Sequence, residues 1–109
     1  MVREKCIGSY IEALEAERLG AERVELCDNL EEGGTTPSYG TIKMVVEKVS
    51  IPAFVIIRPR GGDFFYTEDE IEIMKEDIKV CKSLGVKGVV IGALNRDNTI
   101  NYEAIKEMV

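Results

Sequence analysis

The chain has 109 residues, and its balance of 45% hydrophobic to 31% charged residues is that of one folded globular domain. Its formal net charge of -6, with no cluster of basic residues, argues against nucleic acid as a partner. No apolar stretch approaches the roughly 20 residues that span a bilayer, and the start MVREKC lacks the apolar core of a signal peptide. We therefore expect a single cytoplasmic domain over 1–109 that binds neither nucleic acid nor a membrane.

The first predicted unit is a strand over about 2–7 followed by a helix. Ser9, with Glu12 three residues later, forms a capping-box pattern that opens the helix, and Gly20 is expected to end it. The positions expected to face the core are Ile11, Ala13, Leu14 and Ala16.

The second unit begins with Arg23–Cys27, where polar and apolar residues alternate as in a strand with one buried face. A polar, glycine-rich loop spans about 28–39. Within it, Thr36 and Pro37 resemble a helix N-cap followed by proline at the first helical position. The helix behind this loop carries an apolar stripe of Ile42, Val45, Val46 and Val49.

The third unit pairs a strand over about 53–58 with a helix that Thr67 and Glu70 open in capping-box register and that Gly85 ends. The stripe of this helix is Ile71, Met74, Ile78 and Cys81, so Cys81 is interpreted as a core residue. The fourth unit is a strand over 88–92 and a helix over about 102–109.

Strand and helix thus alternate four times, which predicts an α/β fold with a parallel sheet. This pattern fits an open doubly wound sheet or part of an eight-stranded (β/α) barrel. Glu25 and Arg58 fall on the strand faces that point away from the expected helix side. A barrel interior accepts polar groups near its active-site end, whereas a doubly wound sheet buries both faces, so we favour the TIM-barrel type with about four βα units.

Two strands that should be neighbours carry the same Glu-x-Cys pattern, ending at Cys6 and Cys27. Neighbouring strands lie roughly 4.8 Å apart, so the two thiols could share one soft metal ion if they lie at matching heights. Two thiolates without histidine suit Cu(I). The alternative is that both cysteines are simply small buried apolar residues. Three cysteines without secretory context argue for free thiols rather than for a disulfide framework.

The loop RPRGGD at 58–63 follows a buried strand. It combines several charged side chains with two glycines, which leave the backbone flexible. Arg58 and Arg60 could hold a carboxylate or phosphate, and Gly61 and Gly62 would let backbone amides approach that ligand. Asp63 could orient an arginine or accept a proton. The alternative is that these charges only form ion pairs, such as Asp63 with Arg60, that fix the loop.

Three motifs in order, RVELC at 23–27, EGGTTPS at 32–38 and IRPRGGDF at 57–64, make the chain closely similar to the CutC family of copper homeostasis proteins. The resemblance runs from about Glu4 to the last residue. It implies a cytoplasmic (β/α) barrel that is linked to copper and binds Cu(I) through cysteines matching Cys6 and Cys27. Members of this family are longer, so the chain corresponds to the N-terminal half of the barrel.

The resemblance also implies polar residues at the mouth of the barrel that look like an enzyme site. They are matched here by Glu25, Arg58, Arg60 and Asp63. Two hypotheses follow: a Cu(I)-binding homeostasis protein, or a barrel enzyme that holds a small anionic metabolite between Arg58 and Arg60, with Glu25 and Asp63 as acid and base. Four βα units leave two sheet edges open, so we expect a homo-oligomer that completes the barrel.

Overall fold

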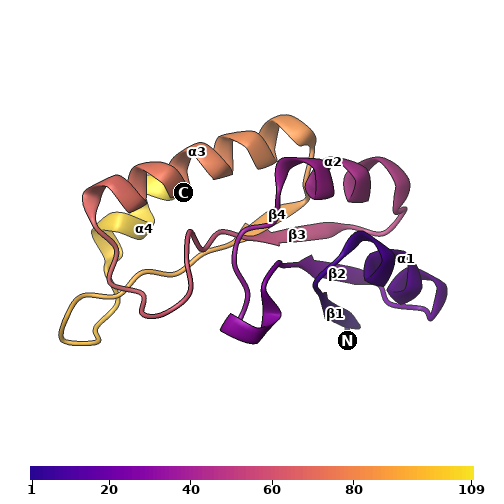
Figure 1. Cartoon of the computed structure of the whole chain (residues 1–109), viewed down its shortest axis with the longest axis horizontal. Coiled ribbons are helices and arrows are strands. Elements are labelled where there is room, and N and C mark those ends of the chain that lie inside the picture. The colour runs from indigo at the N-terminus through magenta and orange to yellow at the C-terminus, as the bar shows by residue number, and fades with distance from the viewer.

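The computed structural model describes all 109 residues and contains one parallel sheet with the strand order β1-β2-β3-β4 (Figure 1). The strands are β1 (Glu4–Ile7), β2 (Arg23–Leu26), β3 (Ala53–Ile56) and β4 (Gly88–Val90). The helices are α1 (Tyr10–Arg18), α2 (Tyr39–Lys48), α3 (Glu68–Leu84) and α4 (Tyr102–Met108), with a short 3-10 turn η1 (Leu30–Glu32). None of these helices combines the length and the apolar character that crossing a membrane requires.

The helices begin at side-chain caps, and two of the three predicted starts are correct. Ser9 Oγ accepts a hydrogen bond from the Glu12 amide at the start of α1, and Thr67 and Glu70 form a complete capping box at the start of α3. The prediction for α2 was wrong, because Ser38 rather than Thr36 is its N-cap. The Thr36 hydroxyl is already engaged elsewhere, since it bonds the backbone of Arg58.

The apolar core lies between the sheet and the helices on one side of it (Figure 1). Val24, Leu26 and Val55 of the central strands are fully buried against the helix layer. The predicted stripes of α2 and α3 are confirmed in outline, with Ile42, Val45, Val49, Ile71, Met74 and Cys81 buried. Ile11 was wrongly assigned to the core: it is exposed, because α1 packs through Ala13 and Ala16 instead.

The strands are shorter than predicted, but their hydrogen bonding continues one residue past the ends of β2 and β3. The Cys27 amide donates to the Ile7 carbonyl over 2.9 Å, and the Ile57 amide donates to the Val90 carbonyl over 2.8 Å. Cys27 and Arg58 therefore follow the carboxyl ends of parallel strands, which is where βα folds place ligands.

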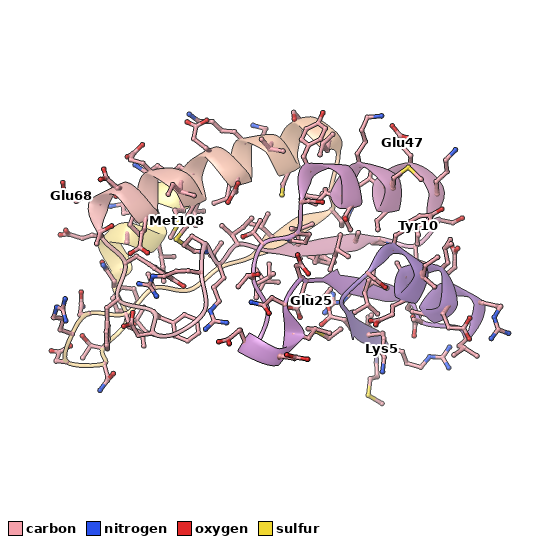
Figure 2. All side chains as sticks on the ribbon, in the orientation of Figure 1. Lys5, Tyr10, Glu25, Glu47, Glu68 and Met108 are labelled. Carbon is pink, nitrogen blue, oxygen red and sulfur yellow. The ribbon has the colours of Figure 1, made fainter.

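The other face of the sheet carries no helix. Its side chains include Arg23 and Glu25 of β2, Phe54 and Ile56 of β3, and Val90 of β4, all half-buried or exposed. Glu25 lies at the sheet, whereas Glu47 of α2 lies on the outer side of the helix layer (Figure 2). A parallel sheet with helices on one face and a partly polar opposite face is half of a (β/α) barrel, so the predicted fold class is confirmed.

Candidate metal centre and its neighbouring arginine loop

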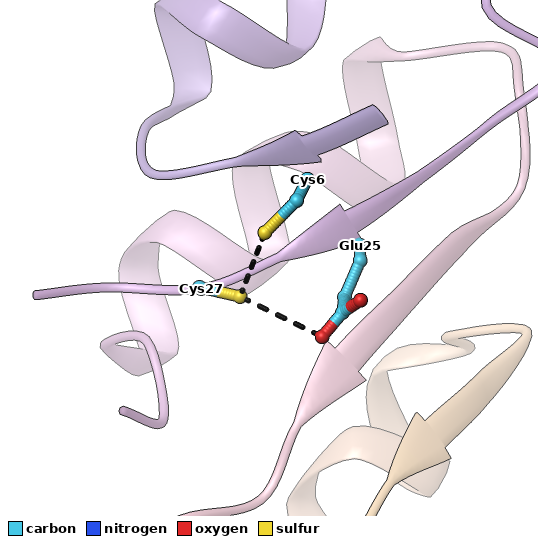
Figure 3. Close-up of side chains that lie close together, drawn as sticks. All are labelled: Cys6, Glu25 and Cys27. Atoms are coloured by element: carbon cyan, nitrogen blue, oxygen red, sulfur yellow. Dashed lines mark hydrogen bonds between the residues drawn. The ribbon is translucent and has the colours of Figure 1, made fainter. Parts of the chain in front are cut away.

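Two thiols and a carboxylate converge on the open face of the sheet (Figure 3). Cys6 Sγ lies 3.7 Å from Cys27 Sγ, and Cys27 Sγ lies 3.9 Å from Glu25 Oε1. One ligand atom from each residue lies within 4.8 Å of the others. The chain therefore brings two soft donors and one hard donor to a single point.

The pairing of β1 with β2 explains how these groups meet. Cys6 is opposite Glu25, and Ile7 is opposite Leu26, so Cys27 sits diagonally from Cys6 rather than directly opposite it. The repeated Glu-x-Cys pattern suggested thiols at matching heights, and the register is instead offset by two residues. Because the offset is an even number, all three side chains stay on the same face.

The two thiols differ in their access to water. Cys6 is exposed at the edge strand, while Cys27 has only 2% of its surface exposed. Burial, followed by the neighbouring Cys6 and Glu25, raises the pKa of Cys27 to about 12. At neutral pH Cys27 is thus a protonated thiol, and a metal ion that binds it must displace the proton.

The spacing of the sulfurs fits a shared metal ion. Two sulfurs that are each about 2.3 Å from one metal are roughly 3.8 Å apart when the angle at the metal is tetrahedral. The observed 3.7 Å between Cys6 and Cys27 agrees with that geometry without movement of the strands. Thiolate ligands favour Cu(I) and other soft ions, while the Glu25 carboxylate offers a third, harder donor.

Arg58 lies in the loop that follows β3 and is almost fully buried, with 6% of its surface exposed. Its Nη1 donates to the carbonyls of Glu32 and Gly34, and its Nη2 donates to the carbonyl of Gly62 over 2.7 Å. The guanidinium also stacks 4.8 Å from the centre of the Phe64 ring. Arg58 thereby ties the loop after β2 to the loop after β3.

Arg60 has no donor left for a ligand. Its Nε and Nη2 bond the Glu70 carboxylate, Nη1 donates to the Gly61 and Asp63 carbonyls, and Nη2 also reaches Asp63 Oδ1 and the Phe65 carbonyl. The Glu70 hydrogen bond raises the pKa of Arg60 and lowers that of Glu70. Arg60 and Asp63 thus form the loop-fixing ion pair that the sequence offered as an alternative.

The glycines of the two loops allow close approach of backbone to side chain. Gly34 has φ +96, and a side chain there would touch the Cys27 thiol at 3.4 Å. Gly62 has φ +89 and presents its carbonyl to Arg58. Gly61 packs against Glu32, because an added Cβ would lie 2.8 Å from Oε2 at the flexible end of that side chain. Gly34 and Gly62 thus let the backbone pack closely against Cys27 and Arg58.

Several residues of this region were not singled out as functional from the sequence. Thr36 bonds the Arg58 backbone, Glu70 anchors Arg60, and the rings of Phe64 and Tyr66 cover the two guanidiniums. The aromatic run directly after RPRGGD is the signal that could have indicated the stacking. Nothing in the sequence pattern links Thr36 to Arg58, 22 residues away.

The whole chain matches a known family. The sequence model of the CutC family matches residues 1–109. The human copper homeostasis protein cutC homolog is 54% identical over 100 residues, and the mouse protein of the same name is 51% identical over 106 residues. These matches cover 92% and 97% of this chain but only 37% and 39% of the human and mouse proteins.

A solved structure shares the fold. The crystal structure of a CutC protein from Streptococcus agalactiae superposes with a TM-score of 0.90 at 40% sequence identity. The superposition covers 100% of this chain and 54% of that protein. This chain spans about two fifths of the length of the curated relatives and about half of the solved one.

Proposed function

This chain belongs to the CutC family, and we propose that it serves copper homeostasis by binding Cu(I) through the thiolates of Cys6 and Cys27. The family supplies the connection to copper, because the human and mouse relatives carry copper homeostasis in their names. The side chains of Cys6 and Cys27 supply the sulfur ligands that suit Cu(I). Copper is here the cargo of the protein, and reduced cysteines of this kind suit the cytoplasm.

The observation that carries the proposal is the convergence of the two sulfurs. Cys6 and Cys27 come from different strands, yet their Sγ atoms lie 3.7 Å apart without a disulfide bond. A soft ion would enter from solvent at the exposed Cys6, and the buried Cys27 would hold it away from water. One accessible and one buried thiolate allow both exchange and retention of the ion.

Glu25 lies next to the buried thiol and bears on how its proton leaves. Binding of Cu(I) requires that Cys27 lose the proton that burial keeps on it. The Glu25 carboxylate lies 3.9 Å from that thiol and can accept the proton or pass it to solvent. Affinity for Cu(I) should therefore rise with pH, because each thiolate that forms must first release a proton.

The proposal is tested by anaerobic titration of the reduced protein with Cu(I) against a chromophoric chelator. The double variant Cys6→Ser, Cys27→Ser should lose tight stoichiometric binding. The matched control is Cys81→Ala, which removes the third thiol from the core and should bind as the unaltered protein does. Unchanged affinity in the double-serine variant would show that copper is not held by these thiols.

We also propose that a second copy of the chain covers the open face of the sheet. The strands β1 and β4 each have one unpaired edge, and Val90 on β4 is an exposed apolar residue of the open face. A hollow of about 650 Å³ runs along β1 and α1, where Ile7, Ala16 and Leu19 are among its lining residues. Pairing β4 of each copy with β1 of the other would satisfy both edges and close eight strands.

A further inference from the structure

Arg58 carries a buried positive charge that no carboxylate of the protein neutralises. It takes part in none of the ion pairs, and its three side-chain hydrogen bonds all go to backbone carbonyls. With 6% of its surface exposed, Arg58 cannot rely on bulk water for solvation. Buried charges in proteins are ordinarily paired, so we expect this guanidinium to have an anionic partner.

Two polar side-chain groups in this place lack a hydrogen bond of good geometry. They still interact, because burial raises the pKa of the Tyr66 hydroxyl and the nearby Arg58 guanidinium opposes that rise. Arg58 has five N–H donors, and its Nε is buried without an acceptor, as is the hydroxyl of Tyr66. Of the four N–H bonds on Nη1 and Nη2, three are used, which leaves one on Nη2. The Nε and Nη2 atoms form one edge of the guanidinium, the edge that binds carboxylates in bidentate fashion.

A cavity adjoins these groups at the carboxyl ends of β3 and β4. Its volume is about 130 Å³, and its lining includes Ile56, Arg58, Phe64, Tyr66, Val90 and Gly92. Ligands of parallel βα folds bind at this end of the strands. The cavity combines one cation and one hydroxyl with otherwise apolar walls.

We propose that this cavity binds the carboxylate of a small organic acid, with Arg58 and the Tyr66 hydroxyl as its donors. A water molecule occupies about 30 Å³ in the liquid, so the cavity accommodates a molecule of roughly four or five non-hydrogen atoms. A carboxylate has two oxygens for the guanidinium edge, and one of them can also accept from the Tyr66 hydroxyl. The apolar walls formed by Ile56, Phe64 and Val90 suit a short alkyl group.

This site is separate from the proposed copper site and differs from a clamp of two arginines. Arg60 is turned to Glu70 and Asp63 and contributes no donor, and the second polar group is Tyr66, which the sequence did not indicate. Phosphate fits less well, because its oxygens outnumber the available donors and the apolar walls would strip its hydration.

The experiment follows the amide resonances of the reduced, metal-free protein during titration with acetate and propionate, with sodium chloride at matched ionic strength. Both acids should give saturable shifts at residues around the cavity, and chloride should not. Tyr66→Phe removes the hydroxyl alone and should weaken binding about tenfold or more, since a hydrogen bond to a charged group is lost. The control Tyr102→Phe alters an exposed tyrosine outside the cavity and should bind normally.

Further measurements keep the test decisive. Without ligand, Tyr66→Phe should be nearly as stable as the unaltered protein, because its buried hydroxyl makes no hydrogen bond of good geometry that the variant would lose. The Cys6→Ser, Cys27→Ser variant should bind the acids normally, so this site and copper binding can fail independently. Shifts no larger than those with chloride, equal affinity in Tyr66→Phe, or tighter binding of inorganic phosphate would each overturn the carboxylate assignment.

Discussion

At the scale of single residues, identical side chains have different roles according to what surrounds them. Arg58 and Arg60 are two positions apart, yet one is buried against carbonyls with an unpaired Nε and the other is saturated by two carboxylates. Likewise Cys6 is exposed, whereas Cys27 and Cys81 are buried. Residue type sets the available chemistry, and the environment decides whether that chemistry is free to bind a ligand.

Cys81 allows a prediction about alkaline pH. Burial, followed by the charge of Asp77, raises the pKa of this thiol from 9.0 to about 11. Below pH 9.0 the folded and unfolded chains both keep the Cys81 proton, so the stabilisation that comes from the raised pKa is fully present there. As the pH rises from 9.0 to about 11, the unfolded chain loses its proton first, and the free energy of unfolding falls.

Urea denaturation at a series of pH values measures this effect. Cys81→Ala should lose stability less steeply across the alkaline range, by up to about 1.4 kcal/mol per pH unit. At neutral pH the variant should be less stable by about 1 kcal/mol, because a core side chain is shortened. Identical slopes in the two proteins would show that Cys81 does not titrate differently on folding.

At the scale of elements, the loop after β3 and the start of α3 form one connected unit. Glu70 closes the capping box by accepting from the Thr67 amide, and the same carboxylate holds Arg60. Arg60 in turn stacks over Tyr66 and fixes the carbonyls of the loop. The loop that positions Arg58 is thereby anchored to a helix.

The coupling between Arg60 and Glu70 can be measured with a double-mutant cycle. Their interaction should make a measurable contribution to the free energy of unfolding, which solvent weakens because Arg60 is partly exposed. The matched comparison is Lys43 with Glu47, a more exposed pair on α2 whose coupling should be smaller. Equal coupling in both cycles would argue against a special anchoring role for Glu70.

At the scale of the whole molecule, the helix layer is complete on one face and the sheet is open on the other (Figure 1). The entire chain superposes on 54% of a solved relative, so its four units have the same arrangement as the matching part of that longer protein. The cluster of Cys6, Glu25 and Cys27 and the Arg58 cavity both lie at the open face or at the carboxyl ends of its strands. Whatever covers this face controls access to both sites.

Sedimentation velocity at micromolar concentration tests the proposed pairing of two copies. The unaltered chain should sediment as a dimer or larger assembly, because exposed strand edges and apolar side chains favour association. Val90→Asp places a charge on the open face and should shift the protein toward monomer. Met44→Asp changes an exposed apolar residue on α2 and should not. A monomeric unaltered protein would contradict the proposal.

The sequence by itself determined the four βα units, the α3 capping box and the polar character of one sheet face. These features are local, since they depend on residue periodicity, caps and alternation within a few positions. The same kind of reasoning failed at Thr36 and Ile11, where a distant partner or the choice of packing face overrides the local pattern.

Only the tertiary structure decided which functional side chains meet. The offset between β1 and β2 placed Cys6 opposite Glu25 and diagonal to Cys27, and strand register depends on how whole elements pack. The difference between Arg58 and Arg60 arose from loops that converge from separate strands. Hydrogen-bond partners and burial are properties of the folded chain. They keep Cys27 protonated and leave the Nε of Arg58 unpaired, and no pattern of residues in the sequence encodes either result.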